Sequence, residues 1–109
     1  MTFKPGDIVA LDFSPTQGHE QSGYRPALVF SKELYNAKTG YVVVCPITNT
    51  LKSFPTRVAL DERTKTTGLI IYEQIRTIDA EAKAPRYLEK IPEDLFGQAI
   101  DIVSSIFAV

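Results

Sequence analysis

The chain has 109 residues, a hydrophobic fraction of 44% and a formal net charge of −1, from 12 basic and 13 acidic side chains. This length suits a single domain over residues 1–109 and is too short for two independent cores. The charge excludes a protein that coats nucleic acid by bulk electrostatics, because such proteins are strongly basic. Any contact with RNA or DNA therefore has to come from a local patch.

No apolar run approaches the roughly 20 residues that a membrane-spanning helix needs, so we expect no contact with a membrane. The N-terminal MTFKPGD lacks the apolar core of a secretory signal, and the single cysteine, Cys45, suits a reducing compartment. We therefore expect a cytoplasmic protein in which Cys45 is a buried packing residue. The single histidine, His19, has no cluster of acids or cysteines at ligand spacing, so we expect no metal site.

The first half of the chain predicts three strands. They cover Asp7–Phe13, which alternates in polarity, Pro26–Phe30, which is short and apolar, and Tyr41–Ile47, which holds three consecutive valines. One helical turn is expected at Lys32–Asn36, before the chain reverses. Pro46 has no N–H to give to a neighbouring strand, so it predicts a sheet edge or a bulge.

The second half predicts more short strands and a terminal helix. Thr56–Leu60 and Leu69–Tyr72 are the expected strands, and Gln74–Ile78 continues the latter. Pro92 suits the first position of a helix that packs its apolar stripe onto the sheet. Together these elements predict a mostly β fold, a small and partly open barrel with a C-terminal helix. The stripe consists of residues at three- and four-residue spacing, namely Leu95, Phe96, Ala99, Ile100, Val103, Ile106 and Phe107.

If the first three strands form a meander, polar residues from distant parts of the chain meet at one rim. The second strand runs away from the loop that precedes it, and the third strand returns towards that loop. Thr48, which closes the third strand, therefore lies near Arg25, which opens the second. Glu20 and Asp12 are expected on or beside the same rim.

These residue types suit work on a phosphodiester. Arg25 offers a planar fork of N–H donors that matches phosphate oxygens, and Thr48 offers a hydroxyl. Glu20, Tyr24 and, with less support, Asp12 are the candidates for moving protons. RNA carries its own nucleophile, the 2′-hydroxyl, so a protein has only to orient it, stabilise the phosphorane and protonate the departing oxygen. That scheme needs no metal.

Taken one at a time, the same residues have ordinary structural interpretations. Arg25 at a strand start is commonly a surface ion-pair partner, Thr48 a turn residue and Glu20 a solvated acid. The basic residues of the middle segment are either a solvated face or one side of a strand-binding groove. Only the combined pattern favours a catalytic rim. These basic residues are Lys52, Arg57, Arg63 and Lys65.

The combined pattern resembles the MazF/PemK family of toxin endoribonucleases. The pieces that carry the resemblance are GDIVALDFSPTQGHEQSGYRPALVFS, YNAKTG, CPIT and, from Glu73 to Asp79, EQIRTID. The resemblance implies an SH3-like, CcdB/PemK-type barrel of about five to seven strands. It implies a homodimer that cuts single-stranded RNA at short sequences without a metal or other cofactor. The products would carry a 2′,3′-cyclic phosphate and a 5′-hydroxyl, and an antitoxin protein would silence the enzyme.

Carried over residue by residue, the resemblance assigns catalytic roles to Arg25, Thr48 and Glu20. Some members of the family carry histidine directly before the arginine, where this chain has Tyr24, so proton transfer by histidine does not carry over. Tyr24 either stacks on a base or packs against Pro26. The RNA contacts are expected from the loops beside these residues and from the EQIRTID segment, namely Asp12, Thr16, Gln17, Tyr24, Asn49, Lys52, Gln74 and Arg76.

Two other functions stay open from the sequence. The first is a non-catalytic toxin that binds a protein target such as DNA gyrase, which on a similar barrel depends on the end of the C-terminal helix. The tail here, SSIFAV, carries no evident polar recognition residues beyond its two serines. The second is a module that binds RNA without cutting it.

Overall fold

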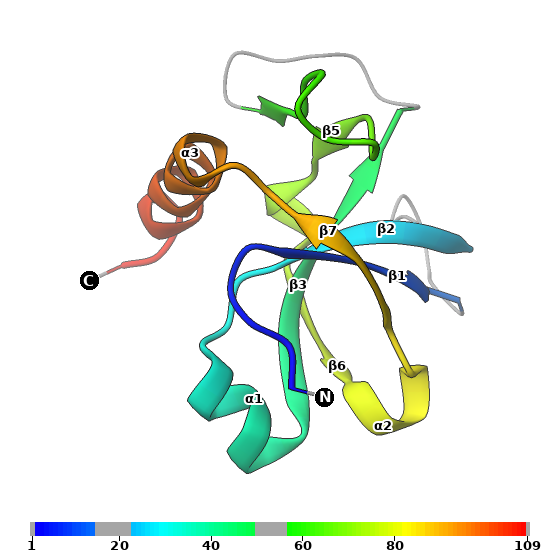
Figure 1. The fold of residues 1–109 in the computed structure, drawn as a ribbon. Coiled ribbons are helices and arrows are strands. Elements are labelled where there is room, and N and C mark those ends of the chain that lie inside the picture. Colours follow the sequence, from blue (N-terminus) through cyan, green and yellow to red (C-terminus); the bar gives the residue numbers. More distant parts are fainter. Residues whose placement is uncertain (1, 15–22, 50–56, 109) are drawn as a thin grey trace.

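The structure is a computed structural model that describes residues 2–14, 23–49 and 57–108 (Figure 1). It confirms a mostly β fold with a C-terminal helix. The elements, in chain order, are β1 (Asp7–Asp12), β2 (Tyr24–Val29), α1 (Glu33–Thr39), β3 (Tyr41–Thr48), β4 (Val58–Ala59), β5 (Leu69–Ile70), η1 (Tyr72–Gln74), β6 (Arg76–Asp79), α2 (Ala80–Lys83), β7 (Arg86–Lys90) and α3 (Glu93–Ser105).

The seven strands of the described residues form one antiparallel, curled sheet (Figure 1). Six of them follow the order β4-β5-β3-β2-β1-β7, and β6 lies off this path and pairs with β3. The first three strands form the expected meander. Strand β3 is central, because its first half pairs with β6 and its last two residues, Ile47 and Thr48, pair with β5. Pro46 lies between these two pairings, where neither β5 nor β6 pairs with it, and it pairs with Ala27 of β2 on its other side. The edge expected at Pro46 is thus a local gap in the pairing on one side of β3.

Both faces of the sheet are buried, each in its own cluster. One face packs under α3 through the stripe residues Leu95, Ala99 and Val103, against β-strand residues such as Leu28 and Ile47. Cys45 lies in this cluster, as expected of a packing residue. The other face gathers the remaining strand residues, namely Val9, Leu11, Phe13, Ala27, Val29, Val42, Val44 and Ile78.

The terminal helix differs from the expectation at both ends. Pro92 is the N-cap of α3 rather than its first residue, and Glu93 and Asp94 fill the first turn, where carboxylates favour the positive end of the helix dipole. At the other end, Ile106 is the C-cap, and the side chains of Ile106 and Phe107 are 48% and 55% exposed. The predicted apolar stripe therefore includes two residues, Ile106 and Phe107, that lie beyond the end of the helix and are not packed against the sheet.

Four other features of the fold were mispredicted or missed. Helix α1 runs for seven residues rather than one turn and ends at Gly40, whose φ of 75° is the left-handed conformation of a helix end. The segment 69–78 is not one strand, because η1 interrupts it before β6. Helix α2 begins where the Asp79 carboxylate accepts bonds from the N–H groups of Glu81 and Ala82. Strand β7 was not expected, and it adds to β1 at the edge of the sheet.

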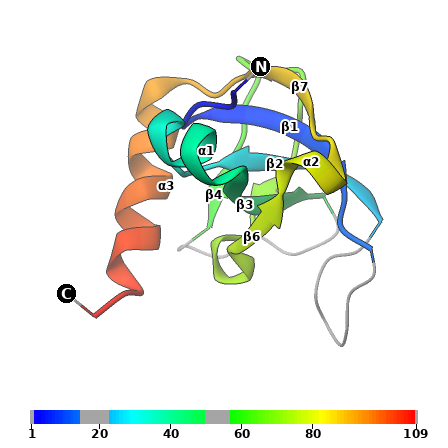
Figure 2. The same ribbon diagram turned by 90° about the horizontal axis from the view of Figure 1, so that it is seen from below.

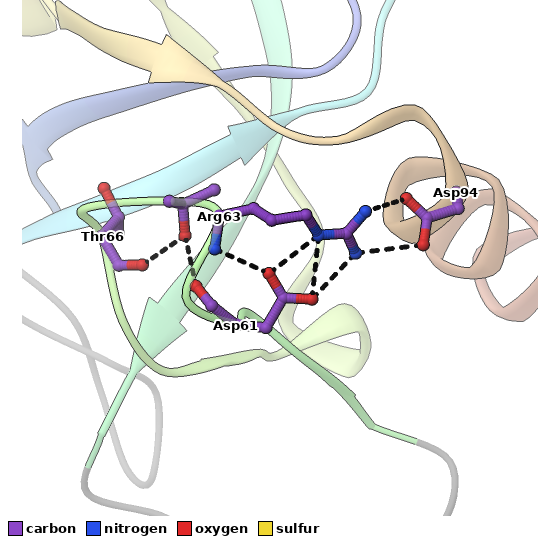
Figure 3. Close-up of polar contacts among 5 residues, drawn as sticks. Asp61, Arg63, Thr66 and Asp94 are labelled. Atoms are coloured by element: carbon purple, nitrogen blue, oxygen red, sulfur yellow. Dashed lines mark hydrogen bonds and ion pairs between the residues drawn. The ribbon is translucent and has the colours of Figure 1, made fainter.

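The loop that joins β4 to β5 is tied to α3 through one arginine (Figure 3). The guanidinium of Arg63 donates to both carboxylate oxygens of Asp61 in its own loop and to both of Asp94 in α3, at 2.8–3.2 Å. These hydrogen bonds hold the pKa of both carboxyls below the ordinary value for aspartate. The loop is thus fixed to the helix start by a two-sided fork.

The same loop is tied to β7 by Glu89. Its carboxylate accepts bonds from the N–H groups of Lys65 and Thr66, at 3.1 and 2.7 Å, and from the Thr66 hydroxyl at 2.7 Å. Partial burial acts to raise the pKa of Glu89. The hydrogen bonds from Thr66 and Lys65 outweigh it and leave the pKa below the ordinary value.

Acidification is therefore expected to weaken the attachment of this loop. A carboxyl whose pKa is lowered by folding stabilises the protein fully above its unfolded value, 4.5 for Glu89, and loses that contribution as the pH falls through its folded value. Urea unfolding from about pH 7 to about pH 3 should show a smaller loss of stability in Glu89→Gln than in the unmodified protein. Glu62→Gln, an exposed carboxyl of the same loop, is the control and should leave the pH dependence unchanged. Equal pH profiles for all three proteins would contradict the assignment to Glu89.

Figure 1 shows the two ends of the molecule side-on, and in Figure 2, seen from below, α1 and α2 lie in front of the sheet. Helices α1 and α2 lie at the end where β3 begins, and the β4–β5 hairpin lies at the end where β3 finishes. None of the described helices is long and apolar enough to cross a membrane.

Candidate active site

The centre of the site is a contact between the start of β2 and the end of β3. Ala27 pairs with Pro46 across these antiparallel strands. Arg25 lies two residues before Ala27 and Thr48 two residues after Pro46, so these two residues face each other. The guanidinium Nη1 of Arg25 donates to the Thr48 hydroxyl oxygen at 3.3 Å. The structure thus confirms the predicted convergence of these two residues, which are 23 positions apart in the sequence.

The two side chains differ in how much of each reaches solvent. Thr48 is only 2% exposed, so its hydroxyl is held in place by the surrounding sheet, whereas Arg25 is half-buried and reaches the surface. A buried hydroxyl with a cationic neighbour is a pre-organised polar group, because little reorganisation is needed when a charge approaches it. The pair therefore offers a fixed cation and a fixed hydroxyl at the end of a rigid sheet.

A second arginine lies on the same face of the sheet. Arg76 opens β6 beside Val44 of β3, and its guanidinium carbon lies 5.5 Å from the centre of the Phe13 ring. Phe13 is buried, so the ring offers a rigid platform on which the cation is attracted by the aromatic face. Sequence reasoning missed Phe13, although it continues the inward alternation of Val9 and Leu11 along β1.

Asp12 and Tyr24 form the outer side of the rim, where they pair in register across β1 and β2. Asp12 accepts a hydrogen bond from the N–H of Ser14 at 2.9 Å, and this bond lowers its pKa. Asp12 is therefore ionised near neutral pH and is a poor proton donor there. Tyr24 is 64% exposed, so much of its surface is open to a stacking partner.

Of the other expected site residues, two lie in described segments close to these. Asn49 follows Thr48 directly, and its amide donates to the Thr67 hydroxyl at 3.0 Å and to the Thr67 carbonyl oxygen at 3.4 Å. Gln74 ends η1, two residues before Arg76, and is half-buried. The expectations for Glu20, Thr16, Gln17, Lys52 and His19 fall on residues outside the described part of the chain.

Two of the basic residues of the middle segment, Arg57 and Arg63, are engaged in ion pairs. Arg57 contacts Glu73 at 2.7 Å, with its side chain only 10% exposed, and Arg63 contacts Asp61 and Asp94. These two arginines are therefore structural, which weakens the interpretation of this segment as one side of a basic groove. Burial raises the pKa of the Cys45 thiol to about 12, so it is not a nucleophile near neutral pH. Within the ranges 2–14, 23–49 and 57–108, no three His, Cys, Asp or Glu side chains form a group that could hold a metal ion.

Comparison with known proteins gives a match over nearly the whole chain. Residues 4–107 match the family model described as PemK-like, MazF-like toxin of type II toxin–antitoxin system. The chain is 35% identical over 105 residues to a protein of Escherichia coli named endoribonuclease PemK, which covers 93% of this chain and 79% of that relative.

Solved structures agree with that match. The crystal structure of MazF from Deinococcus radiodurans has a TM-score of 0.91 and 32% identity, covering 97% of this chain and 96% of that one. A crystal structure of MazE–MazF from the same organism has a TM-score of 0.82 and 27% identity, covering 97% of this chain and 95% of that one.

Proposed function

The chain belongs to the family of PemK-like, MazF-like toxins of type II toxin–antitoxin systems, and from this premise we propose that its activity is cleavage of single-stranded RNA. Relatives that share a third of its residues over most of their length are named endoribonucleases. The observation that carries the proposal is the hydrogen bond between Arg25 and Thr48 at the end of the sheet, where the half-buried Arg25 reaches the surface. It joins a permanent cation to a hydroxyl at a place where a phosphate can approach.

The proposed mechanism uses the nucleophile that RNA supplies. The 2′-oxygen attacks the adjacent phosphorus, the bond to the 5′-oxygen breaks, and the products are a 2′,3′-cyclic phosphate and a 5′-hydroxyl. Arg25 binds a non-bridging phosphate oxygen and stabilises the charge that develops on it, while Thr48 donates to a second oxygen or orients Arg25. The proton of the 2′-hydroxyl leaves and one is delivered to the 5′-oxygen, so no net proton is consumed. Glu20 and Tyr24 are the proposed proton carriers, and neither step is routed through a metal.

The proposed substrate contacts follow from what each rim residue offers. The exposed ring of Tyr24 stacks on a base, a contact worth about 1–3 kcal/mol. Arg76, seated on Phe13, adds a second cation for the RNA backbone on the same face. Asp12 faces the bases rather than the backbone, because its ionised carboxylate would repel a phosphate. Asn49 faces the bases beside it. Thr16, Gln17, Lys52 and Gln74 complete the proposed RNA-binding set.

The proposed partners are an antitoxin, single-stranded RNA and a second copy of the chain. A MazF of Deinococcus radiodurans that shares this fold is solved as a MazE–MazF complex, which supports an antitoxin for this chain. We place the protein in the cytoplasm, because its one thiol, Cys45, suits a reducing compartment. The homodimer stays a prediction from the family resemblance.

Incubating the purified protein with single-stranded RNA in the presence of EDTA tests this function. We expect discrete fragments, with mass spectrometry showing a cyclic phosphate at one new end and a hydroxyl at the other. RNA that is protected but not cut would indicate the non-cutting binding module instead. Intact RNA together with gyrase–DNA cleavage complexes would indicate the gyrase-directed toxin.

A further inference from the structure

The backbone of Thr48 is in unusually close contact with one glycine of the β4–β5 loop. Gly68 has a φ of 128°, a conformation that side chains with a Cβ rarely adopt. A Cβ on Gly68 would lie 2.7 Å from the carbonyl oxygen of Thr48 and 2.9 Å from its carbonyl carbon. Any other residue at position 68 therefore forces a shift of either the Thr48 backbone or the backbone at position 68.

The contact belongs to a junction between the end of β3, at Thr48 and Asn49, and the segment Thr67–Leu69. Leu69, directly after Gly68, pairs with Thr48 across β5 and β3. On the other side of Gly68, the hydroxyl and carbonyl oxygens of Thr67 accept the Asn49 amide. The segment Thr67–Leu69 thus holds two successive residues, the buried Thr48 and the exposed Asn49.

The segment that makes this junction is itself fixed from outside the site. Glu89 of β7 binds the backbone at Lys65 and Thr66, and Arg63 connects the loop to Asp94 of α3. The N–H of Leu60 donates to the Gly68 carbonyl oxygen at 2.9 Å and closes the hairpin. Gly68 therefore contacts Thr48 from a loop that has little freedom to retreat.

From this geometry we propose that Gly68 is a positioning residue for the RNA-cleaving reaction, acting through Thr48. The proposal rests on the proposed function, because it takes Thr48 as a group that acts on the scissile phosphate. The close approach of Gly68 sets the Thr48 backbone, and with it the hydroxyl that meets Arg25 at 3.3 Å. A displacement there changes catalysis more than it changes RNA binding, which is spread over the whole rim.

Gly68→Ala tests the proposal, with Gly40→Ala as its matched control. Gly40 also has a positive φ, 75°, but a Cβ there meets nothing within 4 Å, and it lies at the opposite end of β3 from Thr48. We expect Gly68→Ala to lower kcat about 10–100-fold, since a misplacement of about 1 Å can cost that much. KM should change by less than about threefold, and Gly40→Ala should leave both constants close to those of the unmodified protein.

A second comparison separates positioning through Thr48 from a general loss of structure. In a Thr48→Ala background, the added Gly68→Ala should lower the residual kcat by less than about twofold, because the group it positions is already gone. A further loss as large as that in the Thr48-containing protein would overturn the proposal. So would a Gly68→Ala protein with unchanged kcat.

A measurement without RNA distinguishes this proposal from the proposed function. The NMR signal of the Thr48 methyl group should shift in Gly68→Ala and stay in place in Gly40→Ala. Suppose that the Thr48 signal shifts in Gly68→Ala but the unmodified protein cuts no RNA. This result would support the contact of Gly68 with Thr48 as the one that sets the position of Thr48, and it would refute the proposed endoribonuclease activity. An unmoved Thr48 signal in Gly68→Ala, together with RNA cleavage by that variant at the full rate, would refute the positioning role and leave the proposed function unchanged.

If Gly68→Ala does not fold, loosening the loop at its outer attachment gives the same test. Glu89→Ala removes the acceptor of three hydrogen bonds without touching Thr48, and Glu62→Ala is the control from the same loop. We expect Glu89→Ala to lower kcat and to shift the Thr48 methyl signal, and Glu62→Ala to do neither. A Glu89→Ala protein with unchanged kcat and an unmoved Thr48 signal would overturn the proposal.

Discussion

Replacing Arg25 with alanine is expected to lower the kcat for RNA cleavage by about 10²–10³-fold, the cost of removing one pre-organised donor from a developing oxyanion. Arg25 combines a permanent charge, half-burial and a hydrogen bond to Thr48. Its loss removes both the phosphate contact and the partner that orients the hydroxyl. Initial rates of cleavage of a short single-stranded RNA, measured in EDTA, check this expectation.

Two further variants keep this result specific to Arg25. Arg25→Lys retains the positive charge but not the planar fork, so its activity should lie between those of the alanine variant and the unmodified protein. Arg86→Ala removes an exposed arginine of β7, in the half of the molecule where α2 lies, and should leave kcat unchanged. Cleavage by Arg25→Ala at the full rate would remove this residue from the mechanism.

Replacing Leu28 with alanine is expected to destabilise the fold by about 2–5 kcal/mol, through lost burial and the cavity that remains. Leu28 of β2 is 0% exposed and lies in the cluster that α3 covers. The expected fall in Tm is roughly 10–25 °C for a domain of this size. Calorimetry or circular dichroism during heating measures it.

The chain provides a matched control for that substitution. Leu34 in α1 is 69% exposed, so Leu34→Ala makes the same chemical change with little buried contact to lose. We expect its effect on stability to stay within about 0.5 kcal/mol. A comparable loss at both positions would show that the cluster under α3 does not dominate the stability of the fold.

The parts of the fold that follow from local pattern were predictable from the sequence. Three consecutive valines and a clear alternation predicted the strands that became β3 and β1, because the side-chain period of a strand is visible in a few residues. The pairing of Arg25 with Thr48 needed one more premise, that consecutive strands form a meander. This step brought residues 23 positions apart to the same rim.

The parts that depend on tertiary contacts were not predictable. Strand β7 reads RYLEK, with no strict alternation, and becomes a strand because β1 offers it an open edge. The break at η1 falls at Tyr72–Gln74, directly after the apolar run that suited a strand, and no glycine or proline marks it. The close approach of Gly68 to Thr48 joins two residues whose contact exists only once β3 and β5 have paired.

Within the site, Phe13 shows the same limit. The sequence placed it at the end of an expected strand, but its role as the platform under Arg76 depends on how β6 pairs with β3. The roles assigned to Glu20, Thr16, Gln17 and Lys52 stay predictions, since these residues fall outside the described part of the chain. The assignments to Arg25 and Thr48 now have a geometry that activity measurements can test.

The most direct measurement is a double-variant comparison at the two residues that meet on the rim. We would measure single-turnover RNA cleavage by the unmodified protein, Arg25→Ala, Thr48→Ala and the variant that carries both changes. If the cation and the hydroxyl act as a unit on one phosphate, the double variant loses about as much activity as the more damaging single variant. Independent losses that multiply, or cleavage that survives both changes, would contradict the account.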